Sequence, residues 1–190
     1  EAQQARLRSL IRQAYGIVPG CRALMSAPLY HSAPSVYVQN ALQMAERLVL
    51  APRFDAEQVL ALVEEHRIDV LYLVPIMYVR LLKLPAEVRA KYDLSSIRFV
   101  ASTGSPCSPE VKRAMLDWFG PVIHETYASS EAGLVTVATP EDAAAAVVAA
   151  RPWDALPHER AEVLLRAADL YEGEAAQIFA LLAREAGKGL

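Results

Sequence analysis

The sequence predicts an α/β protein: a layer of parallel sheet and helices comes first, and an all-helical segment follows it. Strand-length apolar runs alternate with helical patterns between residues 21 and 136, which is typical of a parallel α/β sheet. After residue 137 the composition changes, because 16 alanines fall in residues 138–190, against 17 in the preceding 137 residues. Alanine is the strongest helix former, so this change favours helices over sheet.

Five apolar, partly β-branched runs have the length and composition of buried parallel strands. The first helix start that we can identify between them is Asp55, where Gln58 three residues later can complete a capping box. The second is Ser108, an N-cap followed by Pro109 at the first helical position. The expected strands are residues 22–26, 47–51, 70–74, 97–102 and 122–127.

The last part is expected to hold three helices. Thr139-Pro140 starts the first, Pro157 lies near the start of the second, and Gly173 breaks the second. One buried face of the second helix is predicted by three-and-four spacing, and a third helix by resumed apolar spacing. The residues of the buried face are Ala161, Leu164, Leu165, Ala168 and Tyr171, and those of the third helix are Ile178, Phe179 and Leu182. We therefore expect two parts, residues 1–136 and 137–190.

Composition and charge exclude several classes of protein. A hydrophobic fraction of 54% with 22% charged residues excludes a disordered chain, and a net charge of -3 argues against a nucleic-acid binder. Two cysteines, Cys21 and Cys107, are too few for a disulfide framework or a structural zinc site, so a cytoplasmic location is expected. The longest uncharged apolar run, residues 70–79, is too short to cross a membrane. Both chain ends are expected to be cut, since no methionine opens the sequence.

Three loops follow predicted strands, where open α/β sheets bind their ligands. The first contains His31, which could orient a carboxylate; the alternative is a turn histidine without a ligand. The second contains Gly104, which lets backbone N–H groups approach a ligand, although an ordinary tight turn has the same composition. The third offers the Tyr127 ring for stacking, the Ser130 hydroxyl for a phosphate and the Glu131 carboxylate for Mg²⁺.

Five motifs follow one another in a fixed order along the first part of the chain. They are residues 28–34 (Pro-Leu-Tyr-His-Ser-Ala-Pro), Val74-Pro75 with Arg80-Leu81-Leu82, residues 92–98 (Tyr-Asp-Leu-Ser-Ser-Ile-Arg), residues 104–107 (Gly-Ser-Pro-Cys), and residues 118–121 (Trp-Phe-Gly-Pro) leading into 125–131 (Glu-Thr-Tyr-Ala-Ser-Ser-Glu). With these motifs, the run from about residue 24 to 133 resembles the central part of an adenylate-forming acyl-CoA synthetase of the AMP-binding superfamily, especially its fatty-acid-like branch. The resemblance covers more than half of the chain.

The resemblance implies a flavodoxin-like sheet and a ligase that activates a carboxylate with ATP to an acyl adenylate and passes the acyl group to coenzyme A. His31 would lie near the acyl carboxylate, and Gly104 with Ser105 would line the adenine and acyl pocket. Tyr127 would stack on adenine, Ser130 would contact the α-phosphate, and Glu131 would hold Mg²⁺. His31 and Glu131 are thus the candidate catalytic residues, and a small carboxylate and a nucleotide are the expected partners.

Other parts of such ligases have no counterpart in this sequence. The sequence lacks the loop that binds the triphosphate, the aspartate that binds ribose and the hinge. It also lacks the C-terminal domain with its catalytic lysine. The resemblance therefore implies a remnant of a ligase that is inactive as an isolated chain.

Residues after about 150 are similar to the N-terminal helices of aldehyde dehydrogenases of the proline-utilisation type. The similarity rests on the order of residues 153–157, 159–161, 164–170 and 184–188. Our leading explanation is a fusion or an assembly error that joins pieces of two enzymes, and the alternative is a genuine new, domain-swapped protein. For the function, one alternative is part of an NAD-dependent aldehyde or glutamate-semialdehyde dehydrogenase. A second is a non-catalytic helical interaction module that buries its apolar stripe against a partner, with self-association through the C-terminal helices as one form.

Overall fold

The computed structural model describes residues 2–129, 133–150 and 156–177. All five strands expected from the sequence are present, and a sixth strand, β6, follows them. The strands are β1 (Arg22–Met25), β2 (Arg47–Leu50), β3 (Val70–Leu73), β4 (Phe99–Ser102), β5 (Ile123–Ser129) and β6 (Gly133–Ala138). The helices are α1 (Ala2–Tyr15), α2 (Ser32–Met44), α3 (Ala56–His66), α4 (Pro75–Leu82), α5 (Ala86–Arg89), α6 (Pro109–Phe119), α7 (Pro140–Ala150) and α8 (Pro157–Gly173).

The strands form one sheet in the order β2-β1-β3-β4-β5-β6. The ladders that join β1 to β2 and β3, β3 to β4, and β4 to β5 are parallel. Apolar residues are in register at the centre of the sheet, with Leu24 opposite Leu71, Leu71 opposite Val100, and Val100 opposite Ile123. The order β2-β1-β3-β4-β5 is that of flavodoxin-like sheets, so the predicted parallel α/β fold is confirmed.

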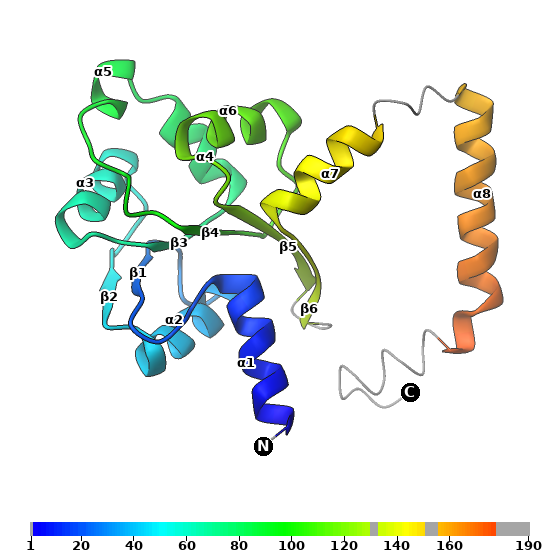
Figure 1. Ribbon diagram of the computed structural model, residues 1–190, viewed down its shortest axis with the longest axis horizontal. Helices are drawn as coiled ribbons and strands as arrows, with labels where there is room; N and C mark the ends of the chain where they lie inside the picture. The colour runs from blue at the N-terminus through cyan, green and yellow to red at the C-terminus, as the bar shows by residue number, and fades with distance from the viewer. Residues whose placement is uncertain (1, 130–132, 151–155, 178–190) are drawn as a thin grey trace. The chain divides into compact units, whose positions relative to one another are not determined.

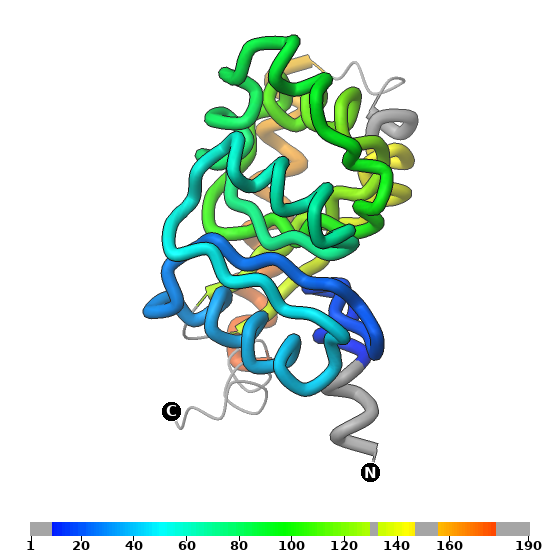
Figure 2. The backbone as a smooth tube through the Cα atoms, turned by 90° about the vertical axis from the view of Figure 1, so that its left-hand side faces the viewer, coloured from blue at the N-terminus to red at the C-terminus, as the bar shows by residue number. Residues whose placement is uncertain are grey.

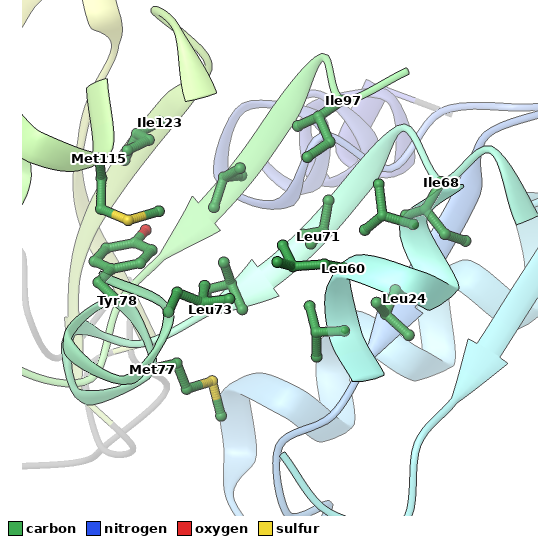
Figure 3. Packing of buried hydrophobic residues seen from close by; sticks show 14 residues of the cluster. Leu24, Leu60, Ile68, Leu71, Leu73, Met77, Tyr78, Ile97, Met115 and Ile123 are labelled. Carbon is green, nitrogen blue, oxygen red and sulfur yellow. The ribbon is translucent and has the colours of Figure 1, made fainter. Parts of the chain in front are cut away.

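Helices α3, α4 and α6 cover one face of the sheet, above it in Figure 1. Alternate strand residues point to this face, among them Leu24, Leu71 and Leu73, as expected from the two-residue period of a strand. Leu60 of α3 and Met115 of α6 pack against them (Figure 3). This apolar layer fixes the start of α6 and therefore the loop that leads into it.

Helices α1 and α2 cover the opposite face, below the sheet in Figure 1. The strand residues between those of the first cluster point this way, including Met25, Tyr72 and Ala101. Tyr37 of α2 is fully buried among them, and its hydroxyl donates a hydrogen bond to the Val70 carbonyl oxygen at 3.0 Å. Both faces of the central strands are thus covered, which explains why these strands read as continuous apolar runs.

The edge strand β2 faces the viewer in Figure 2. Its first residue, Arg47, is exposed, and its Nη1 lies 3.3 Å from His66 Nδ1 at the end of α3. A charged side chain on an edge strand discourages pairing with another chain.

Both helix starts predicted from caps are confirmed. The Asp55 carboxylate accepts a hydrogen bond from the Gln58 backbone N–H at 2.9 Å, and the Ser108 hydroxyl accepts one from the Val111 N–H at 3.4 Å. Pro109 is the first residue of α6. The N-cap satisfies a backbone donor that would otherwise lack a partner, so α6 begins directly after the loop that follows β4.

The segment ahead of β4 is tied to α3 through Asp93. Its carboxylate accepts hydrogen bonds from Arg67 Nη1 at 2.6 Å and from the Ser95 N–H at 2.9 Å. The hydrogen bonds from Ser95, aided by Arg67, lower the pKa of Asp93 from 3.8 to about 2. Because the folded-state pKa lies below the unfolded value, this stabilisation is present above about pH 4 and is lost as the pH falls toward 2.

We therefore expect Asp93→Asn to be less stable than the wild type at neutral pH, with a difference that shrinks below about pH 4 and is mostly gone by pH 2. Urea denaturation from pH 7 to pH 2 measures both curves. Asp55→Asn is a control for a capping carboxylate elsewhere on α3. A difference between wild type and Asp93→Asn that stays constant down to pH 2 would contradict the assignment.

The chain divides into two compact units, residues 1–130 with 134–140 and residues 131–133 with 141–190. Helix α7 begins at Pro140, the last residue of the first unit, and α8 of the second unit runs from Pro157 to Gly173, as the caps and the glycine predict. The prediction that α8 has a buried face is wrong, since no residue of α8 is buried. The predicted third helix, with Ile178, Phe179 and Leu182, lies outside the described residues. In the described parts of the chain, no helix has the length and apolar character needed to cross a membrane.

Candidate functional site

The predicted site loops follow β1, β4 and β5, and these strands run in one direction. Their carboxyl ends therefore meet at one edge of the sheet. Along the chain, the strand order reverses between β1 and β3, because β2 is added on one side of β1 and β3 to β5 on the other. Ligands of open α/β sheets bind beside such a reversal, outside the carboxyl ends of the strands.

His31 lies at the N-cap of α2, directly after the loop that follows β1. It is exposed, and its ring packs against the Tyr30 ring with centroids 4.5 Å apart and planes inclined by 49°. The histidine thus lies at the predicted edge of the sheet, in contact with an aromatic neighbour. Two strands, β3 and β4, separate β1 from β5, so His31 is at the far end of the site from Tyr127.

The Gly104 turn follows β4. Gly104 has φ +94, a conformation that side chains rarely adopt, and a Cβ built there would lie 3.4 Å from Val74 Cγ1. That distance is an ordinary van der Waals contact, so it is the backbone conformation rather than a lack of space that favours glycine here. Ser105 beside it is exposed, so a ligand in solution can reach it at this edge of the sheet.

Tyr127 lies near the end of β5, the strand next to β4. Its side chain is 71% exposed, so a ring face is open for a planar ligand. The structure thus brings Gly104, Ser105 and Tyr127 to neighbouring strand ends. The other two predicted residues of this loop, Ser130 and Glu131, lie outside the described residues.

Two buried threonines join the Gly104 turn to β5, and the sequence pattern does not predict their role. Thr103 Oγ1 donates a hydrogen bond to the Thr126 carbonyl oxygen at 3.3 Å, and Thr126 Oγ1 donates one to the Ser102 carbonyl oxygen at 3.4 Å. The partners are 23 and 24 residues apart in the sequence. No local spacing signals such a pairing.

A largely buried ion pair lies on the α6 side of β5. Lys112 Nζ of α6 is 2.5 Å from Glu125 Oε2, two residues before Tyr127. Cys107 lies nearby, and burial together with the Glu125 charge raises the pKa of its thiol. A thiol with a raised pKa stays protonated at neutral pH, which argues against Cys107 as a nucleophile.

The predicted metal site depends on Glu131, which is not among the described residues. Among those that are described, no group of three or more His, Cys, Asp or Glu side chains could hold a metal ion. Mg²⁺ binding therefore stays a prediction.

The family model of the AMP-binding enzyme matches residues 3–169 of the chain. The chain belongs to the AMP-binding enzyme family. The match runs across residue 137 and into α8, so it does not stop where the sequence composition changes. The resemblance of the last segment to aldehyde dehydrogenases, and with it the fusion, receives no support from these comparisons.

Known members of the AMP-binding family are similar to this chain over part of their length. A 4-coumarate–CoA ligase-like protein of Arabidopsis thaliana is 31% identical over 110 residues, which is 57% of this chain and 20% of that protein. A medium/long-chain fatty-acid–CoA ligase of Mycobacterium tuberculosis is 35% identical over 114 residues, 60% of this chain and 19% of that protein. The chain thus spans about a fifth of the length of these relatives.

A solved structure shares the fold and part of the sequence. The amide bond synthetase of Marinactinospora thermotolerans is 27% identical, with a TM-score of 0.64, over 74% of this chain and 28% of that chain. The flavodoxin-like arrangement observed here is therefore found in a solved relative as well.

Proposed function

We propose that the chain carries part of the nucleotide- and acyl-binding edge of an ATP-dependent carboxylic acid–CoA ligase that works through an acyl adenylate. Family membership supports the reaction class. The observation that supports the site most directly is the exposed Tyr127 ring beside the Gly104 turn, at the carboxyl edge of the sheet. An open aromatic face and an accessible backbone turn suit a planar base.

Each predicted residue has a defined task in this proposal. Tyr127 stacks on adenine, Gly104 and Ser105 line the adenine and acyl pocket, and His31 lies near the acyl carboxylate. Ser130 donates to the α-phosphate, and Glu131 supplies an oxygen ligand for Mg²⁺. When bound, the metal neutralises negative charge on the phosphate oxygens.

In the reaction of the whole ligase, a carboxylate oxygen attacks the α-phosphorus of ATP and pyrophosphate leaves. The thiol of coenzyme A then gives up its proton to solvent, its sulfur attacks the acyl carbonyl carbon, and the C–O bond to AMP breaks, so that AMP leaves with the bonding electrons. Hydrogen-bond donors fixed at the sheet edge stabilise charge on the phosphate oxygens during these steps. Alone, the 190-residue chain is expected to bind AMP weakly without turning over ATP.

Isothermal titration with AMP and Mg²⁺ tests this function. The wild type is expected to bind AMP, and Tyr127→Ala to weaken binding about tenfold, because losing an aromatic contact costs about 1–1.5 kcal/mol. Tyr171→Ala is a matched control, since Tyr171 on α8 is 69% exposed, close to the 71% of Tyr127. Equal AMP affinity of Tyr127→Ala and wild type would refute the site.

The dehydrogenase-like origin of residues 137–190 stays a hypothesis that rests on motif order alone. Continuous sequencing of the source DNA across residues 134–140 tests it: an uninterrupted frame from ligase-like to dehydrogenase-like sequence would support a fusion. A frame that continues into further AMP-binding sequence would exclude it. NAD binding is expected only if the fusion is found.

Self-association through the C-terminal helices is likewise a proposal. Light scattering of the chain with and without residues 141–190 tests it. A dimer that becomes a monomer on truncation would support the proposal, whereas a monomer before truncation would refute it.

A further inference from the structure

The regular pairing of β4 with β5 ends just before the candidate site. The last residues in register are Ser102 and Glu125. Thr103 comes directly after β4 and Thr126 follows Glu125 within β5, and the site residues Gly104 and Tyr127 come next. The contacts that hold these two segments together beyond Ser102 and Glu125 therefore set the spacing between the Gly104 turn and the Tyr127 ring.

Two side-chain hydrogen bonds cross this gap in opposite directions. The Thr103 hydroxyl donates to the Thr126 carbonyl oxygen at 3.3 Å, and the Thr126 hydroxyl donates to the Ser102 carbonyl oxygen at 3.4 Å. Thr103 is 6% exposed and Thr126 is 8% exposed. Because the hydroxyls are shielded from water, water does not readily replace either bond.

We propose that Thr103 and Thr126 are positioning residues that clasp the Gly104 turn to β5 and thereby hold it beside Tyr127 in the arrangement that receives the nucleotide. This inference rests on the proposed function. Neither threonine touches the ligand in this scheme. Each acts through the residue that follows it, Gly104 or Tyr127.

The backbone of the turn explains why a clasp is needed. Gly104 at φ +94 has no side chain to anchor the turn, and glycine is the residue with the most conformational freedom. Without the two bonds, the turn spends part of its time away from Tyr127. The apparent affinity for a ligand falls in proportion to the competent fraction, so a turn that is in place a fifth of the time binds about five times more weakly.

The test compares isosteric and conservative variants. Thr103→Val and Thr126→Val keep the shape but remove the hydroxyl, whereas Thr103→Ser and Thr126→Ser keep the hydroxyl. Hydrogen exchange of residues 103–107 reports whether the turn is held, and AMP titration reports the consequence for the site. We expect the valine variants to speed exchange and weaken AMP binding about three- to tenfold, and the serine variants to recover most of both.

Ser96→Ala is the matched control for a structural effect alone. The Ser96 hydroxyl donates to the Ile68 carbonyl oxygen at 2.7 Å ahead of β4, at the opposite edge of the sheet. Its loss is expected to lower stability while leaving exchange at 103–107 and AMP affinity unchanged.

The outcomes separate this inference from the proposed function. Wild-type exchange in the valine variants overturns the clasp, and faster exchange with unchanged AMP affinity overturns its positioning role. A drop in AMP affinity for Ser96→Ala equal to that of the valine variants also overturns it. If the wild type fails to bind AMP, the proposed function fails, while the exchange data still decide the clasp.

Discussion

Replacing Gly16 by alanine is expected to destabilise the protein by about 3 kcal/mol, from overpacking and a left-handed backbone together. A Cβ on Gly16 would lie 2.3 Å from Phe99 Cγ, well inside van der Waals contact, and the residue has φ +67. The Phe99 ring has little room to move, because it is buried and stacks on the His124 ring with centroids 3.8 Å apart. The end of α1 therefore needs a glycine where it meets β4.

Gly20→Ala is the control for backbone conformation alone. Gly20 has φ +78, and nothing lies within 4 Å of a Cβ built on it. Its substitution is expected to cost about 1 kcal/mol, the cost of a left-handed residue with a side chain. Urea denaturation of both variants gives the two free energies of unfolding. Equal losses would contradict the close approach of Gly16 to Phe99.

Much of the sheet can be predicted from the sequence because its central strands are buried on both faces. Residues 70–73 of β3 are all buried, so they form an unbroken apolar run that local pattern detects. Strand β6 lies at the edge of the sheet and is partly exposed, and it adjoins the alanine-rich segment. A half-exposed strand beside a helical composition gives little local signal, even though β6 is longer than β1 to β4.

Helix α1 is not predicted from the sequence, for a related reason. Its first residues are polar, and near its end Ile11 and Ala14 are buried. Helix α1 depends on tertiary contacts more than on its own pattern, and such contacts join residues that the sequence separates widely. The Arg98 guanidinium, for example, donates to the Gly16 carbonyl oxygen at 3.2 Å from 82 residues away.

The candidate site likewise contains residues that a local sequence pattern predicts and residues that only contacts with other elements reveal. The loops that bear His31, Gly104 and Tyr127 could be placed at one edge, because parallel strands put their carboxyl ends together. Thr103, Thr126 and the Lys112–Glu125 pair could not be assigned roles, since each acts through a partner on another element. Sequence pattern thus places residues at the ends of strands more readily than it finds the partners that hold those residues in place.

Removing the hydroxyl of Tyr37 is expected to lower the free energy of unfolding by about 2 kcal/mol, the range for losing a fully buried hydrogen bond. Tyr37 of α2 is completely buried, and burial raises the pKa of its hydroxyl well above the usual value, so the group stays a donor. It donates to the Val70 carbonyl oxygen at the start of β3. Tyr37→Phe keeps the ring and its edge-on contact with Tyr72, and so isolates this bond.

Tyr78→Phe is expected to cost less. Tyr78 of α4 is as deeply buried and points toward Met115 (Figure 3). Its hydroxyl makes no hydrogen bond of regular geometry with a described residue, although the Ser102 side chain at the end of β4 is close enough to lower its pKa in part. Because at most a poorly formed hydrogen bond is lost, the variant should lose less than about 1 kcal/mol. Paired denaturation curves measure the contrast. A loss for Tyr78→Phe as large as that for Tyr37→Phe would show that the Tyr78 hydroxyl and Ser102 form a full hydrogen bond in solution.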